Sequence, residues 1–149
     1  SNEVYKLDGL QVACGTMGLP TATVRLRGPR GNLHIEAAIG TGPVDATYKA
    51  INAIVDAPNT LLEFNIHAIT EGIDALGEVT VRLQGKNGGK TQRTSPQSGK
   101  PSARTFGGYG ADTDIIVASA KAYLAALNKY IVASGRYKIQ ETTPAVQSI

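Results

Sequence analysis

Hydrophobic and polar residues alternate along three successive stretches of the first forty residues. Apolar side chains occupy every second position of the segments 10–14, 22–26 and 33–39. Alternation with a period of two is typical of β-strands, and polar side chains such as Arg25 and Arg27 at the intervening positions favour an antiparallel sheet with one packed face. The apolar side of the third strand is formed by Leu33, Ile35, Ala37 and Ile39. Cys14 continues the apolar side of the first strand, so we expect it to be a small core residue.

The period of the pattern then changes to that of a helix. One apolar stripe is formed by Val44, Tyr48, Ile51 and Val55, which are three or four positions apart. Pro43 lies in the first turn, where proline is tolerated, and residues 57–59 end the element. The first third of the chain therefore predicts a βββα unit.

The same order of elements recurs in the second half of the chain. Alternating strands are predicted at 62–68 and 79–83, with a turn at 72–77. A Gly/Ser/Lys-rich loop at 85–103 is followed by a short strand at 104–106 and a helix from about 112 to 130. A Gly-x-Gly sequence precedes each helix, at Gly40–Gly42 and Gly108–Gly110. The pattern predicts an α+β fold of two βββα units in pseudo-repeat, with antiparallel sheets packed on helices, in a dimer.

The second predicted helix has almost no polar face. A helix that is apolar nearly all round needs burial on more than one side. In a two-layer domain one side would meet the sheet and the other a partner subunit; the alternative is a helix fully enclosed within one chain. Ser119 and Lys121 interrupt its apolar stretch, which makes it a poor candidate for crossing a membrane.

Length and charge limit the classes of function. The 149 residues suffice for one domain, which we place at 5–131 with halves 5–57 and 60–131, between a tag remnant or linker at 1–4 and a C-terminal tail at 132–149. Five basic residues and no acid lie between 86 and 104, leaving ten basic against twelve acidic residues elsewhere. A basic loop without aromatic support does not indicate nucleic-acid binding. A single cysteine rules out an internal disulfide.

No motif in the chain completes a known catalytic or nucleotide site. The two Gly-x-Gly sequences lack the third glycine of a dinucleotide fingerprint, with Asp45 and Thr113 at those positions. Residues 88–91 resemble the end of a P-loop, but Gln84 replaces its first glycine. Two interpretations of the Gly-x-Gly sequences stay open. The helix start after the glycines can bind one carboxylate, or each glycine pair only makes a tight turn between strand and helix. Asp112 and Asp114 are placed to cap the second helix.

Three linked motifs resemble a known family. They are GTGPVDA at 40–46, EGIDA at 71–75, and GYGADTDII at 108–116 continuing into the helix to 128. In this order they resemble the C-terminal allosteric domain of 2-isopropylmalate synthase over residues 5–128. The segment 10–16, LQVACGT, is most similar to cyanobacterial and plant members.

The resemblance implies a homodimer of paired βββα units that binds L-leucine near the dimer interface as a feedback inhibitor. The full enzyme condenses acetyl-CoA with 2-oxoisovalerate in a separate TIM barrel that uses a divalent metal, so neither a catalytic site nor a cofactor is expected in this chain. By similarity, the effector pocket draws on Gly40, Gly42, Val44, Asp45, Leu61, Phe64, Ala68, Ala111 and Thr113. Our hypothesis is that helix N–H groups bind the leucine carboxylate, Asp45 the ammonium, and the apolar members the side chain.

Two other functions stay open. An isoleucine-sensing domain of a citramalate synthase would share this architecture, and the sequence does not resolve a one-methyl shift in branching. A purely structural dimerisation domain with a degenerate pocket is the second alternative. Neither a nucleic acid nor a membrane is expected as a partner, and the expected location is the cytoplasm, or the plastid stroma in a plant.

Overall fold

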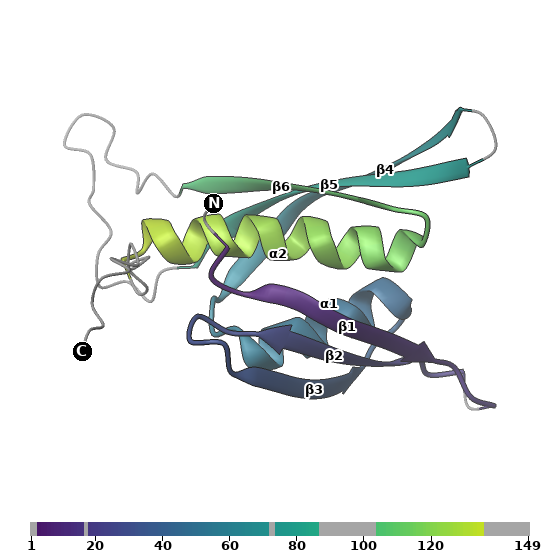
Figure 1. Ribbon diagram of the computed structural model, residues 1–149, viewed down its shortest axis with the longest axis horizontal. Helices are drawn as coiled ribbons and strands as arrows, with labels where there is room; N and C mark the ends of the chain where they lie inside the picture. Colours follow the sequence, from purple (N-terminus) through teal and green to yellow (C-terminus); the bar gives the residue numbers. More distant parts are fainter. Residues whose placement is uncertain (1–2, 17, 72–73, 87–103, 136–149) are drawn as a thin grey trace, which may run out of the picture.

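Two three-stranded antiparallel sheets, each followed by one helix, make up the structure (Figure 1). The computed structural model describes residues 3–16, 18–71, 74–86 and 104–135. The first unit consists of β1 (Lys6–Ala13), β2 (Thr21–Arg27), β3 (Leu33–Ile39) and α1 (Pro43–Ile54). The second consists of β4 (Asn59–Glu71), β5 (Asp74–Gly85), β6 (Thr105–Asp112) and α2 (Ile115–Ala133). The predicted α+β class and the repeated βββα order are confirmed.

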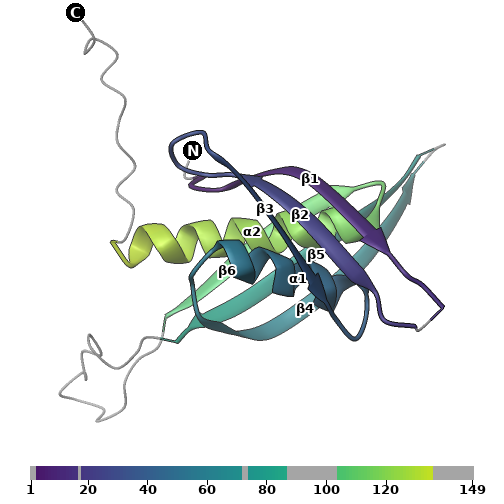
Figure 2. The ribbon, with the colours of Figure 1, turned by 90° about the horizontal axis from the view of Figure 1, so that it is seen from below.

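The two helices lie side by side between the two sheets (Figures 1 and 2). Helix α1 packs on β2 and β3, α2 packs on β5 and β6, and the helices contact each other. Helix α2 also reaches β1 of the first sheet. Both helices begin at the same end of the molecule, on the right of Figure 1, where the β4–β5 hairpin also projects.

The core forms where the inner faces of both sheets meet the helices. Its strand residues are Ala22, Val24 and Leu26 of β2 and Val79, Val81 and Leu83 of β5. These are the alternating apolar positions of the two central strands, as the period-two pattern requires. The helices contribute many alanines to the same core, which lets the backbones come close.

The second Gly-x-Gly sequence does not stand at a helix entrance, and that prediction is wrong. Gly108 and Gly110 lie inside β6, which continues to Asp112, and α2 begins only at Ile115. A Cβ atom on Gly108 would lie 2.0 Å from the carbonyl oxygen of Ala122, and one on Gly110 would lie 2.3 Å from that of Ala118. These glycines therefore let the backbone of α2 lie directly on β6.

Helix α2 is enclosed by its own chain rather than by a partner. Of its 19 residues, 11 are buried, between the second sheet on one side and α1 and β1 on the other. The prediction that its second side meets a partner subunit is therefore wrong, because the helices form a middle layer. By length and composition alone α2 could cross a membrane, but 61% of its most apolar 18-residue window is buried within the domain, as in the core helix of a globular fold.

The apolar side of β3 faces outward, whereas the alternating pattern predicted that it packs against the core. In the β2–β3 register Ile35 pairs with Arg25 and Leu33 with Arg27, so the apolar residues of β3 share the outer face with these arginines. Leu33, Ile35 and Ile39 are 50%, 59% and 58% exposed. Cys14 is also exposed, beyond the end of β1, so the prediction of a core cysteine is wrong.

The two units are joined through aromatic and amide side chains. The Tyr48 ring of α1 stacks on the Tyr123 ring of α2 with centroids 4.1 Å apart, and the Tyr48 hydroxyl donates to the Ser119 carbonyl at 3.2 Å. The Tyr123 hydroxyl donates to Asn52 Oδ1 at 2.6 Å and accepts from Asn59 Nδ2 at 3.1 Å. These bonds hold the two helices parallel and in register.

Parts of the predicted domain organisation lie outside the described residues. These are residues 87–103, which are most of the basic loop, and residues 136–149 of the C-terminal tail. The assignments of both segments stay predictions.

Candidate functional site at the helix entrances

The turn from β3 into α1 leaves the start of the helix without a side-chain cap. Gly42 is the N-cap residue, Pro43 follows in the first turn, and no side chain accepts from the first N–H groups. Two of these, on Val44 and Asp45, have no carbonyl four residues earlier within the helix. The amide of Ala46 already donates to the Gly42 carbonyl at 2.9 Å. The entrance therefore offers donors and the positive end of the helix dipole.

Asp45 closes the turn that precedes the helix. Its Oδ2 accepts from the Thr41 amide at 2.9 Å and lies 3.2 Å from Lys49 Nζ. The bond from Thr41, followed by the contact with Lys49, holds the pKa of the Asp45 carboxyl below its usual value. Every contact of Asp45 with a described residue is made by Oδ2. Oδ1 is therefore available for a further donor.

The two glycines of this turn have different roles. A Cβ atom on Gly40 would lie 2.3 Å from the Ala46 nitrogen, so only glycine fits between β3 and α1. A Cβ atom on Gly42 meets no atom within 4 Å. Gly40 is therefore required for packing, whereas Gly42 leaves open space in front of the helix.

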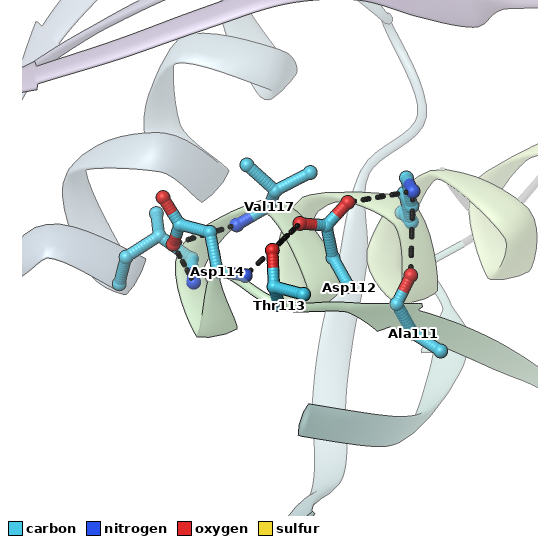
Figure 3. Close-up of polar contacts among 7 residues, drawn as sticks. Ala111, Asp112, Thr113, Asp114 and Val117 are labelled. Atoms are coloured by element: carbon cyan, nitrogen blue, oxygen red, sulfur yellow. Dashed lines mark hydrogen bonds and ion pairs between the residues drawn. The ribbon is translucent and has the colours of Figure 1, made fainter. Parts of the chain in front are cut away.

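The entrance of α2 is closed by its own side chains (Figure 3). Asp114 is the N-cap residue, and its Oδ1 accepts from the amides of Ile116 at 2.8 Å and Val117 at 3.5 Å. Asp112 accepts from the Asp114 amide at 2.9 Å and pairs with Lys121 at 3.0 Å. The first of these contacts, followed by the second, lowers the pKa of Asp112. The predicted cap at Asp114 is confirmed, whereas Asp112 is the last residue of β6.

Three of the predicted site residues lie on α1 and β4, which are linked by one aromatic contact. The Phe64 ring of β4 meets the Tyr48 ring of α1 edge-on, with centroids 6.1 Å apart. Val44 lies one helical turn before Tyr48, toward the open entrance. Ala68 follows Phe64 on the same face of β4, because it is four residues further along the strand. The contact between Tyr48 and Phe64 connects the elements that carry these three residues, and their role in a pocket stays a prediction.

The remaining predicted residues are not brought to this slot within one chain. Leu61 precedes Ala68 by seven strand residues, a separation of about 23 Å at ~3.3 Å per residue, which exceeds the length of one leucine. Ala111 pairs with Glu78, on the opposite face from the Gly110–Val79 pair that packs on α2. Thr113 is exposed and donates to Asp112. Their assignment to the pocket stays a prediction.

Two residues near the slot were missed at the level of the sequence. Tyr48 is buried between Phe64 and Tyr123, and this burial raises the pKa of its hydroxyl. The helical stripe assigned it to the core and gave no sign of its contact with β4. Ile66 lies between Phe64 and Ala68 on the same face and is 49% exposed. The period-two alternation along β4 could have identified Ile66, because it places this residue on the same face as Phe64 and Ala68.

Two hollows on the described surface are lined by other residues than the predicted ones. One depression of about 290 Å³ lies between β1 and α2 beside Tyr5 and Leu124, and another of about 280 Å³ lies beside Asn52 and Asn59. Neither is lined by any of the nine predicted effector residues. Among the described residues, no group of three or more His, Cys, Asp or Glu is arranged to hold a metal ion.

The repeated βββα order, with both helices between two antiparallel sheets, defines an α+β domain in which one of the two helix entrances lacks a side-chain cap. The family model described as the LeuA allosteric (dimerisation) domain matches residues 1–131. The chain therefore belongs to this family of allosteric and dimerisation domains.

Relatives of known name carry the same domain. The chain is 55% identical to 2-isopropylmalate synthase of Gloeobacter violaceus over 85% of its length, and 49% identical to that of Gloeothece citriformis over 98%. It is 48% identical over 86% of its length to a protein of Arabidopsis thaliana named 2-isopropylmalate synthase 2, chloroplastic. It spans only 21%, 24% and 20% of these three relatives. The chain thus corresponds to the allosteric part of much longer proteins.

Proposed function

We propose that this domain binds L-leucine and acts as the feedback sensor of a 2-isopropylmalate synthase. The observation that carries the proposal is the open entrance of α1, one turn before Tyr48, whose ring contacts the Phe64 ring of β4. The family and the names of the relatives support it, since a synthase with an allosteric domain needs an effector. The condensation of acetyl-CoA with 2-oxoisovalerate then belongs to the rest of such a protein, in the cytoplasm or in a plastid stroma.

The α1 entrance is the better of the two helix starts for the leucine carboxylate. The amides of Ile116 and Val117 at the α2 entrance already donate to Asp114, whereas no side chain caps α1. Open N–H groups and the helix dipole favour an anion at this point. Gly42 keeps the space in front of the helix free.

The other two groups of leucine also find chemistry near this entrance. Asp45 is held ionised, and its Oδ1 points to no described partner, so it can accept from the ligand ammonium. The isobutyl group would lie on Val44, Phe64 and Ala68. Because Ala68 and Ile66 stay exposed in one chain, we propose that a second copy completes the apolar slot.

Gly42→Asp tests the carboxylate site. The new carboxylate would cap the α1 amides and repel the ligand carboxylate, so leucine binding measured by calorimetry should be lost. Because aspartate is a better N-cap than glycine by a few tenths of a kcal/mol, the melting temperature without leucine should not fall. Gly42→Ala is the matched control: it adds only a methyl group to open space and should keep binding. Normal leucine affinity in Gly42→Asp would contradict the assignment.

Asp45→Asn tests the ammonium site in the same assay. The amide can still accept the Thr41 bond, but it carries no charge, so leucine affinity should fall on the order of tenfold, about 1.4 kcal/mol. Unchanged affinity would remove Asp45 from this role.

A thermal-shift panel separates the leucine sensor from its rivals. A ligand that binds only the folded state raises the melting temperature. We expect the largest increase with leucine and smaller ones with isoleucine, valine and 2-oxo acids. A larger shift with isoleucine would favour a citramalate synthase sensor, and no shift at millimolar concentrations a purely structural dimerisation domain.

A further inference from the structure

The four strands at the sheet edges differ in how their free backbone groups are protected. β1 carries a bulge between Leu7 and Gly9, where Asp8 pairs with Arg25 at 2.6 Å. β4 carries a bulge between Leu61 and Glu63. Bulges and charges at an edge discourage pairing with another strand.

The edge of β6 is covered by lysines of α2. Gly85 donates to the Arg104 carbonyl, so alternation along the strand directs the carbonyls of Gly107 and Ala111 away from β5. Lys129 Nζ donates to Gly107 at 2.7 Å, and Lys121 Nζ to Ala111 at 3.3 Å. Two outward carbonyls of this edge are therefore occupied.

The edge of β3 has neither a bulge nor a covering lysine, and its one charged residue, Glu36, pairs with Val24 on the inner face of the sheet. Its pairing with β2 runs without a bulge from Leu33 to Ile39, and the strand contains neither lysine nor proline. Gly40 donates to the Pro20 carbonyl across the sheet, so the backbone groups of Leu33, Ile35, Ala37 and Ile39 point to the free edge. Within the described part of the chain, no side chain bonds to them. The same four residues carry the exposed apolar side chains of this strand.

We propose that β3 pairs antiparallel with β3 of a second copy of this chain, which joins two sheets into one of six strands. An antiparallel pair of identical strands has the twofold symmetry of a closed dimer, and the family is described as a dimerisation domain. The pairing gives the outward N–H and C=O groups of β3 partners and brings together apolar side chains that one chain leaves in water. The inference rests on the dimer named in the proposed function and assigns its surface.

Charge complementarity selects the register. A twofold axis at Glu36 would place the two Glu36 carboxylates opposite each other, which is unfavourable. An axis at Ile35 places His34 of each copy opposite Glu36 of the other, on the face that carries neither Leu33 nor Ile35. It also places the two Ile35 side chains together. We therefore expect the axis at Ile35. Since the β3–α1 turn follows β3 directly, the open entrance of α1 then lies close to the interface.

Ile35→Lys tests the surface. A lysine at the axis places two like charges together, so the dimer dissociation constant measured by sedimentation should rise on the order of thirtyfold or more, as for a central interface residue. Leu62→Lys is the matched control, because Leu62 is a similarly exposed apolar residue at 44%, on the edge strand of the other sheet. It should leave the dimer intact. A dimer lost in Leu62→Lys and kept in Ile35→Lys would overturn the proposal, as would a wild-type chain that is monomeric at high concentration.

Two further measurements read the strand pairing directly. The amides of Ile35 and Ala37 should exchange slowly in the dimer and rapidly in the Ile35→Lys chain, provided the latter retains its core protection. In a Cys14→Ser background, Ile35→Cys should form a disulfide-linked dimer under mild oxidation, because Cα atoms of a bonded antiparallel pair lie about 5.5 Å apart. Cross-linking only through Glu36→Cys or Ala37→Cys would keep the surface and overturn the register. Fast exchange at both amides with no cross-link at any of the three positions would overturn both.

The same samples separate this inference from the leucine site. A dimer with protected β3 amides but no thermal response to leucine would defeat the proposed sensor and leave the interface standing. A monomer that leucine stabilises would do the reverse.

Discussion

The two βββα units share an order of elements but differ at the entrance of their helices. In the first unit α1 has 12 residues, begins after a glycine and lacks a side-chain cap. In the second, α2 has 19 residues and begins after Asp114, which caps two of its amides. The two units therefore pack their helices on their sheets in the same way but differ in the hydrogen bonding of the first helical amides. The entrance of α2 is capped by its own side chain, whereas the entrance of α1 has no side-chain cap and is the one that we propose binds the ligand.

The glycines show the same division of roles. Gly108 and Gly110 bring β6 against the backbone of α2, and Gly40 brings β3 against the start of α1. Gly42 alone among these four has open space where a side chain would lie. In the second unit both glycines of the Gly-x-Gly sequence serve close packing. In the first unit only Gly40 does so, and Gly42 leaves open space in front of α1.

Gly108→Ala should have the largest effect, because it attacks packing that the second unit cannot replace. The added methyl carbon would lie 2.0 Å from the Ala122 carbonyl oxygen, so α2 must move away from β6. We expect a loss of about 3 kcal/mol or more in the free energy of unfolding, measured by urea denaturation. Gly42→Ala should cost under about 1 kcal/mol in the same experiment. Similar losses for the two variants would break the proposed difference between the glycines.

Tyr123→Phe should have the next largest effect, because it uncouples the two units. Removing the hydroxyl takes one partner each from Asn52 and Asn59. Leaving polar groups unsatisfied costs roughly 1–3 kcal/mol, and we expect about 2 kcal/mol by urea denaturation. Tyr109→Phe is the control, because it removes a hydroxyl that donates to Glu78 on the exposed outer face of the second sheet. An equal loss in both variants would argue against the coupling.

Asp114→Ala should destabilise less and act locally. Losing an N-cap carboxylate costs about 1 kcal/mol, and hydrogen exchange at Ile116 and Val117 should become faster. Asp114→Asn keeps an accepting oxygen and should retain most of the stability. If Asp114→Ala also creates a second leucine site by calorimetry, the difference between the two entrances rests on this cap alone.

The smallest expected effect is the loss of stability at acidic pH that comes from protonation of Asp45 and Asp112. Hydrogen bonds from backbone amides lower the pKa of both carboxyls in the folded state. Their contribution to stability is therefore complete above the unfolded pKa of about 4 and is lost as the pH falls through the lower folded value. Melting temperatures measured between pH 6 and 3 should decline less steeply for Asp45→Asn and for Asp112→Asn. A slope equal to that of the wild-type chain in both would contradict this account.

Much of the fold could be predicted because the central strands and helices obey local periodicities. The alternation in β2 and β5 and the stripe of α1 follow directly from which side chains are buried. The boundaries near Gly108 failed because glycine is also used inside a strand for close packing. Of the site, the α1 entrance and the face of β4 were predictable as separate elements. Their contact through Tyr48 and Phe64 was not, because it joins different units.

The sequence by itself determined the βββα order, the family motifs and the cap at Asp114, because these depend on residues close together in the chain. Only the tertiary structure decided which faces are buried. It placed both helices between the sheets, so that the nearly all-apolar α2 is enclosed by its own chain. It also turned the apolar side of β3 outward, because alternation shows that a strand has two different faces and only packing determines which one meets the core.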